Sequence, residues 1–116
     1  MRYILLIYAN EGEWEAKGPS ERQTVIAEHG ALDAELVRTG KWKACDALQP
    51  TRTATTVRIR DGKSLVTDGP YAETKEQLGG FYVIEARDLD DAIAIAARIP
   101  PARWGAVEVR PVWEAP

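Results

Sequence analysis

Short runs of apolar residues divide the chain into segments of strand length, separated by more polar stretches. The run Tyr3–Tyr8 and the run Leu78–Ala86 show no regular alternation of apolar and polar residues. Runs of this kind are typical of strands that are buried on both faces. We expect two further strands at Trp42–Leu48 and Ala106–Val112, so the pattern predicts four strands for the main sheet.

A long helix is predicted between the first two strands, after a polar loop at Asn10–Gly18. Pro19 or Ser20 begins this helix, and Ser20 is the candidate N-cap because a serine hydroxyl can accept a hydrogen bond from a free backbone N–H. Gly40 ends the helix about twenty residues later, at the position where a glycine relieves left-handed backbone strain.

A second helix and a β-hairpin complete the predicted elements. Asp88 is the expected N-cap of a helix at Asp91–Ile99, and Pro100 stops this helix because proline has no backbone N–H to donate. The Asp-Gly pair at 61–62 is a strong hairpin signal, since a tight hairpin turn needs residues that tolerate positive φ. This pair separates the expected strands Thr53–Arg60 and Lys63–Thr67.

The order of these elements predicts one α+β domain over residues 1–116, with a ferredoxin-like βαββαβ arrangement and an inserted β-hairpin. Two helices can cover only one face of a four-stranded sheet. Because two of the strands are apolar on both faces, the second face needs a cover of its own. We therefore expect a homodimer in which the sheets of two copies face each other.

Composition narrows the classes of partner and chemistry. The 116 residues are 45% hydrophobic and carry a formal net charge of −3, which favours small molecules or proteins over nucleic acids or anionic membranes as partners. A single cysteine, Cys45, excludes an intrachain disulfide and fits a reducing cytoplasm. No apolar stretch reaches the roughly 18 residues that a membrane-spanning helix requires.

The chain also lacks several motifs on which common reactions depend. It contains no glycine-rich phosphate loop, no HExxH sequence, no paired cysteines and no nucleophile elbow. Nucleotide hydrolysis, zinc catalysis and serine hydrolysis therefore lack their required parts. We predict no metal and no cofactor for this chain.

The only histidine lies on the face of the long helix that should meet the sheet. This face has apolar residues at alternating spacings of four and three, and it contains Val25, His29, Leu32, Leu36 and Thr39. We expect the imidazole to be at least partly buried. Two interpretations remain open, a histidine that only packs in the core and a general acid or base held in a cavity.

A cluster of charged residues follows the turn that begins at Asp68. The Asp-Gly-Pro turn can form without the charged side chains that follow it, which are Glu73, Lys75 and Glu76. They are either a solvated helical turn or part of a ligand site, with Arg110 from the last strand as a counter-charge. The Gly79-Gly80 pair at the entrance of the next strand predicts a bulge or a close approach of two backbones.

The segment from Asp68 to Glu76 reads DGPYAETKE, and it resembles the DGPF (DGPFAETKE) branch of the YCII-related family of small bacterial proteins. Tyr71 stands where the name of that branch has phenylalanine. The resemblance covers the chain from Tyr3 to Val112, and it implies a dimeric α/β barrel. It also strengthens the interpretation of Glu73, Lys75, Glu76 and Arg110 as a ligand site, and Tyr71 is a further candidate for that site.

The same resemblance implies a role for the histidine. Many members carry a histidine eleven residues before the glycine that ends the first helix, and His29 and Gly40 reproduce this spacing. In the YciI-like branch the histidine pairs with an aspartate of an Asp-Pro step after the second helix. Here that step is Ile99-Pro100, so the expected partner is missing and Asp68 is the candidate that replaces it in space.

Two functional hypotheses follow from these residues and from the family. The first is a small-molecule site in which His29 and Asp68 perform proton transfer or elimination on a small organic substrate. The second is a non-catalytic module that binds a ligand or a protein. Family members are often encoded beside, or fused to, extracytoplasmic-function sigma factors, which implies an accessory role in their regulation. The missing aspartate favours the second hypothesis, and the retained histidine spacing favours the first.

Overall fold

The computed structural model describes all of residues 1–116, and its main feature is a four-stranded sheet with the strand order β2-β5-β1-β6. All three strand pairs are antiparallel. This α+β architecture is the predicted one, and its order is consistent with a ferredoxin-like fold. The strands are β1 (Arg2–Ala9), β2 (Trp42–Ala47), β5 (Gln77–Glu85) and β6 (Ala106–Pro111).

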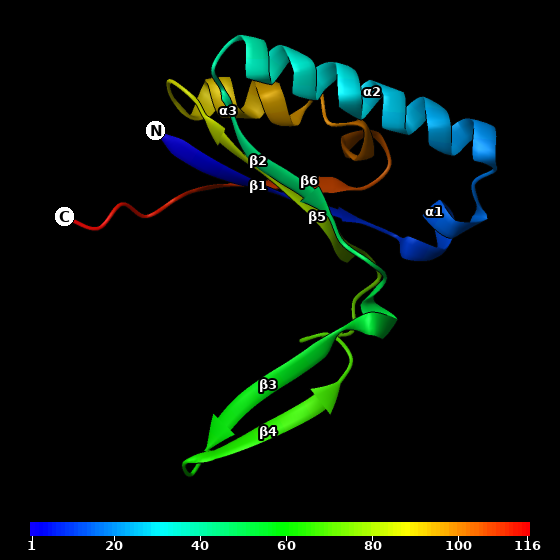
Figure 1. Ribbon diagram of the computed structural model, residues 1–116, viewed down its shortest axis with the longest axis vertical. Helices are drawn as coiled ribbons and strands as arrows, with labels where there is room; N and C mark the ends of the chain where they lie inside the picture. Colours follow the sequence, from blue (N-terminus) through cyan, green and yellow to red (C-terminus); the bar gives the residue numbers. More distant parts are fainter.

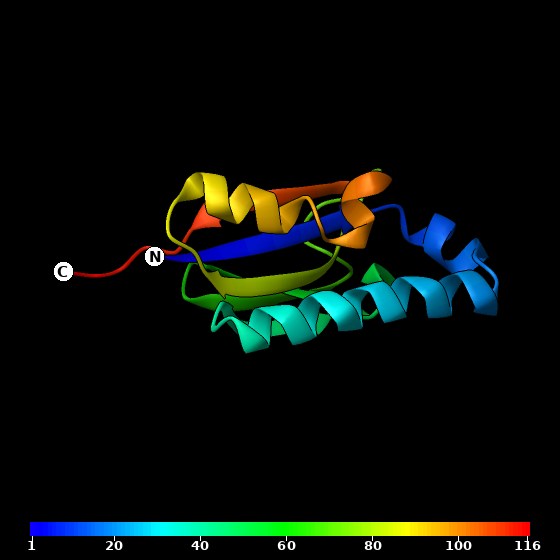
Figure 2. The ribbon, with the colours of Figure 1, turned by 90° about the horizontal axis from the view of Figure 1, so that it is seen from above.

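Both long helices, α2 (Pro19–Arg38) and α3 (Leu89–Ala96), lie on the same face of this sheet (Figures 1 and 2). Gly40 ends α2 as predicted, with φ of 74°. The backbone N–H of Lys41 donates to the carbonyl of Leu36 at 2.8 Å, so the last carbonyls of α2 are satisfied by a left-handed cap. None of the helices is long and apolar enough to cross a bilayer.

The predicted start of α2 at Pro19 is confirmed, but the predictions of a loop at Asn10–Gly18 and of an N-cap at Ser20 were wrong. A short helix, α1 (Glu11–Ala16), lies inside the segment that we expected to be a loop. Asn10 caps α1, because its side chain accepts a hydrogen bond from the Glu13 N–H at 3.0 Å. The N-cap of α2 is Gly18 rather than Ser20, since Pro19 already occupies the first helical turn.

The second helix begins and ends earlier than predicted, at Leu89 and Ala96 rather than at Asp91 and Ile99. Asp88 is its N-cap, as expected, and accepts from the Asp91 N–H at 2.9 Å. However, α3 ends at Ala96, and a 3₁₀ helix, η2 (Pro100–Arg103), follows it. Proline disfavours helical geometry at the residue before it, so Pro100 affects the conformation of Ile99 as well as its own.

The predicted hairpin is confirmed as β3 (Thr55–Arg60) and β4 (Lys63–Asp68). Asp61 and Gly62 have φ of 52° and 73°, which are the positive values that a tight hairpin turn requires. A 3₁₀ turn, η1 (Thr51–Thr53), replaces the expected beginning of β3. The hairpin forms a sheet of its own and projects from the body of the molecule on the side opposite the helices (Figure 1).

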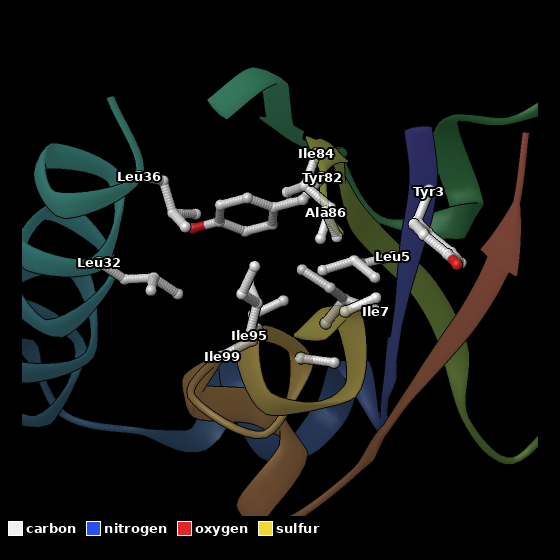
Figure 3. Close-up of a cluster of buried hydrophobic side chains, with 12 residues drawn as sticks. Tyr3, Leu5, Ile7, Leu32, Leu36, Tyr82, Ile84, Ala86, Ile95 and Ile99 are labelled. Atoms are coloured by element: carbon white, nitrogen blue, oxygen red, sulfur yellow. The ribbon is translucent and has the colours of Figure 1, made fainter. Parts of the chain in front are cut away.

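The hydrophobic core lies between the main sheet and the two long helices (Figure 3). The buried face of β1 carries Leu5, and the buried face of β5 carries Ile84, both fully inaccessible to solvent. The predicted stripe on α2 is confirmed for Val25, Leu32 and Leu36, which are buried, whereas Thr39 is exposed because it lies at the C-cap, beyond the last helical residue. The core cluster contains Tyr3, Leu5, Ile7, Leu32, Leu36, Tyr82, Ile84, Ala86, Ala92, Ile95, Ala96 and Ile99.

The opposite face of the sheet has no helix over it. The strand register places Ile4 beside Val83 and Leu6 beside Phe81 on this face, which we call the open face. These four side chains are only half-buried. The strands β1 and β5 are therefore apolar on both faces, as the sequence pattern indicates, but a single chain covers only one of them.

Candidate functional site

A cavity of about 520 Å³ lies between α1, α2, η2 and the adjoining ends of β1, β2 and β5. The apolar part of its wall includes Val25, Ile26 and the indole rings of Trp14 and Trp104. Polar and charged residues also line this wall, and His29 is the only histidine among them, so we call the space the His29 cavity. A cavity of this volume and character suits a small organic molecule.

The two neighbouring glycines of β5 shape the floor of the cavity. Ile7 pairs with Gly80 but Tyr8 pairs with Leu78, so Gly79 is an extra residue in the strand and forms a bulge. A Cβ atom on Gly80 would lie 2.8 Å from the carbonyl oxygen of Asp46. Both predictions for the glycine pair are confirmed, and both residues line the cavity.

His29 belongs to a chain of hydrogen bonds that begins at Asp33, one turn further along α2. The Tyr82 hydroxyl donates to Oδ1 of Asp33, and the same hydroxyl oxygen lies 3.0 Å from Nδ1 of His29. Figure 3 shows the Tyr82 ring reaching from β5 toward α2. Because the hydroxyl has one hydrogen and gives it to the carboxylate, its oxygen must accept from His29, which places the imidazole hydrogen on Nδ1.

The second ring nitrogen of His29, Nε2, makes no hydrogen bond within the chain and is not fully buried. In the tautomer with a hydrogen on Nδ1, Nε2 carries a lone pair that can accept a proton. Burial lowers the pKa of His29 below its ordinary 6.5, although the nearby Asp33 and Glu28 carboxylates act in the opposite direction. The ring is therefore neutral at pH 7 and can act as a base.

Two further titratable side chains of this group, Tyr82 and Cys45, stay protonated at neutral pH. Burial raises the pKa of Tyr82, and its hydrogen bond to Asp33 raises it further. Burial also raises the pKa of the Cys45 thiol, which lies 3.8 Å from Oδ2 of Asp33. A thiol held in this form is a poor nucleophile, so His29 is the reactive group of the cluster.

We expect the lowered pKa of His29 to be measurable in two ways, by the titration of the imidazole itself and by the pH dependence of the free energy of unfolding. The unfolded chain takes up a proton at about pH 6.5 and the folded chain only at lower pH, so the free energy of unfolding should decrease as the pH falls below about 6.5. It should level off once the folded ring is also protonated. An NMR titration of the single imidazole measures the pKa directly, and a value at or above 6.5 would contradict this prediction. In His29→Gln this part of the pH dependence should disappear.

Arg22 is the only cationic residue in the wall of the cavity. Its Nη2 donates to the backbone carbonyl of Glu15 at 2.6 Å, and the guanidinium carbon lies 5.9 Å from the centre of the Trp14 ring. No carboxylate forms an ion pair with it. Its Nε is buried and has no hydrogen-bond partner.

The predicted partner of His29 lies elsewhere. Asp68 ends β4, at the base of the projecting hairpin, and it is exposed. No hydrogen bond or ion pair joins it to His29, and it does not line the cavity. Within one chain the expected dyad does not form, and Asp33 acts on the imidazole through Tyr82 instead.

The predicted ligand-binding residues also lie outside the cavity wall. Tyr71 is 78% exposed, and Arg58 stacks on its ring at 5.3 Å. The side chains of Glu73, Lys75 and Glu76 are exposed and make no hydrogen bond or ion pair. This segment is not a helical turn, but it does adjoin the cavity, because the Asn10 side chain in the wall donates to the Lys75 carbonyl at 3.1 Å.

Arg110 does not serve as a counter-charge for that segment. Its guanidinium pairs with Glu108, two residues earlier on β6. The register places Arg110 beside Ile4, so it belongs to the open face. His29 approaches the sheet from the face that carries the helices, and the two residues are therefore on opposite sides.

Sequence reasoning missed Arg22, Asp33 and Tyr82. A signal for the two helical residues was present, since Asp33 is four residues after His29 and Arg22 is seven residues before it. Both spacings place a residue on the same helix face as the histidine. Nothing in the sequence alone singles out Tyr82, because its distance to His29 depends on how α2 packs on β5. No three His, Cys, Asp or Glu side chains gather in a way that could hold a metal ion.

Comparison with known proteins places the whole chain in one family. The model of the YCII-related domain matches residues 1–116. An uncharacterised protein of Rhizobium meliloti (strain 1021) is 39% identical to this chain over 114 residues, which span 97% of this chain and 92% of the relative.

Proposed function

The chain belongs to the YCII-related family, and we propose that its His29 cavity binds a small organic molecule from which His29 removes a proton. The observation that carries this proposal is a neutral imidazole, fixed by Tyr82 through Nδ1, in a residue that lines a cavity and whose Nε2 has no hydrogen-bond partner. A histidine that only packs in the core has no need of a cavity beside it.

Each residue of the relay has a defined part in this step. The substrate proton passes to Nε2, and the electrons of the broken bond remain on the substrate, where they form a double bond if a leaving group departs. The imidazolium is stabilised because Nδ1–H donates to the Tyr82 oxygen, whose own hydrogen is held by the Asp33 carboxylate. The apolar side chains of the wall lower the local dielectric constant and thereby strengthen these interactions.

The proposal is tested by hydrogen exchange in D₂O, which requires no knowledge of the final product. We would incubate the protein with small ring-bearing acids, ketones and phenols, and follow the loss of individual carbon-bound proton signals by NMR. Exchange above the rate of the buffer alone supports proton transfer. If compounds perturb the His29 ring signals but none exchanges, the protein binds without catalysing, which is the alternative that the missing Asp-Pro aspartate favours.

We further propose that two copies associate through the open face and the β3–β4 hairpin. The Cα radius of gyration is 16.1 Å, whereas a compact chain of this length should have about 13 Å. The difference arises from the hairpin, which exposes Val57, Ile59 and Val66. An isolated two-stranded hairpin is marginal in water. A second copy that covers both the hairpin and the open face supplies the missing contacts.

This assembly predicts different results for two exposed valines. Val66 of the hairpin is 64% exposed, and Val37 of α2 is 60% exposed. Val66→Lys should convert a particle of twice 12.8 kDa into one of 12.8 kDa in light scattering, because it places a charge in the interface. Val37→Lys is the matched control and should leave the mass unchanged. A native protein that is monomeric at micromolar concentration would rule out the dimer.

A further inference from the structure

The guanidinium of Arg22 has hydrogen-bond donors that the protein itself does not use. Of its three nitrogens only Nη2 has an acceptor, the carbonyl of Glu15. Nε is buried without a partner, and Nη1 makes no hydrogen bond. A half-buried arginine without a carboxylate partner is unfavourable in an apolar wall, because both its charge and its donors are left uncompensated.

Four carboxylates line the cavity with Arg22, and three of them, those of Glu11, Glu15 and Asp33, are already engaged with other groups. Both oxygens of the Glu11 carboxylate accept hydrogen bonds from Thr51, at 2.7 Å from its N–H and 2.8 Å from its hydroxyl. The Glu15 carboxylate pairs with Arg52 at 2.9 Å. These contacts hold α1 against η1 and leave the guanidinium of Arg22 for a group from outside the chain.

The position of Arg22 relative to His29 sets the size of that group. Seven residues of α-helix correspond to two turns, so the two side chains leave the same face of α2 about 10 Å apart. Both side chains line the same cavity of about 520 Å³, whose wall also contains the rings of Trp14 and Trp104. A group that meets both residues is therefore a small molecule with an apolar, ring-sized body.

We propose that Arg22 binds the carboxylate of a small ring-bearing acid and thereby places the reactive atom of that acid at Nε2 of His29. The inference rests on the proposed function, because it assigns the substrate class of the same cavity. The indole ring of Trp14 lies over the guanidinium and the carbonyl of Glu15 fixes one of its edges, so the cation is oriented before the ligand arrives.

The test compares charged and neutral ligands of equal shape. Benzoate and phenylacetate are titrated against benzamide and phenylacetamide, and binding is followed through the NMR signals of the His29 ring. The native protein should bind the acids about 10- to 100-fold more tightly than the amides, which is the usual range for a charge-assisted hydrogen bond. Arg22→Gln should reduce this ratio to near one while amide binding is retained.

Arg38→Gln is the matched control, since Arg38 lies on the same helix with its side chain 72% exposed to solvent. It removes the same charge and should leave the ratio unchanged. If acids and amides bind the native protein equally, or if Arg22→Gln keeps the preference for acids, the role of Arg22 is overturned while the cavity remains a ligand site. If none of the four compounds shifts the His29 signals, the cavity as a site for such ligands fails as well.

Discussion

Replacing His29 by glutamine is expected to decrease proton exchange by about 10² to 10⁴-fold on the compound that the native protein exchanges fastest. Glutamine fills a similar volume and can still contact the Tyr82 hydroxyl, but its amide cannot accept a proton at neutral pH. The measurement is the rate of loss of the exchanging proton signal in D₂O, with native and variant protein at equal concentration.

Tyr82→Phe is the companion variant for this experiment, because it keeps the ring in the core and removes only the hydroxyl. The imidazole of His29 then loses the acceptor that fixes its tautomer, so the exchange rate should lie between those of native protein and His29→Gln. Thermal unfolding of each variant checks that the fold is retained. Undiminished exchange in His29→Gln would show that another group is the base.

Replacing Asp91 by asparagine should decrease the free energy of unfolding by about 2 to 3 kcal/mol. The carboxylate of Asp91 is buried, with 8% of the residue exposed. It accepts from Lys41 Nζ at 2.9 and 3.0 Å and from the Arg87 N–H at 3.0 Å. These contacts join the end of α2 to the start of α3, and removing the charge leaves the ammonium of Lys41 without its partner.

Asp90→Asn provides the matched control, because Asp90 lies in the same first turn of α3 but is exposed. It loses only the interaction with the helix dipole, so its cost should not exceed about 1 kcal/mol. Chemical denaturation measures both variants, and equal losses would contradict a special role for Asp91.

The pH dependence supplies a second test of Asp91. The Arg87 N–H and the Lys41 ammonium lower the pKa of this carboxyl. A carboxyl with a lowered pKa stabilises the fold above its unfolded pKa of about 3.9, and this contribution is lost as the pH falls through the folded value. Native protein should therefore lose stability below about pH 4 more steeply than Asp91→Asn does.

The fold was largely predictable because most of its signals are local. The hairpin turn requires positive φ at two adjacent residues, and Asp61 and Gly62 are residues that allow it. The end of α2 needs a glycine, and Gly40 is there. The short helix α1 was missed because six residues carry little periodic signal and its cap at Asn10 reads equally well as a loop residue.

Less of the candidate site could be predicted. The position of His29 on the buried face of α2 was correct, since the spacing of apolar residues alone defines that face. Its partner was sought at Asp68, which is prominent in sequence because it opens the turn. The true contact is Tyr82, a residue with the ordinary appearance of a core aromatic.

By itself, the sequence determined the order of the elements, the apolar face of each element and the turn residues. It also determined the place of the histidine on α2. These features depend on backbone preferences and on periodicity within one segment. Only the tertiary structure decided that α2 lies on β5 close enough for His29 to meet the Tyr82 hydroxyl. It also left Arg22 without an ion-pair partner and placed the hairpin on the side of the molecule opposite the helices. Such contacts join residues far apart in the chain, and they depend on packing distances that no local pattern encodes.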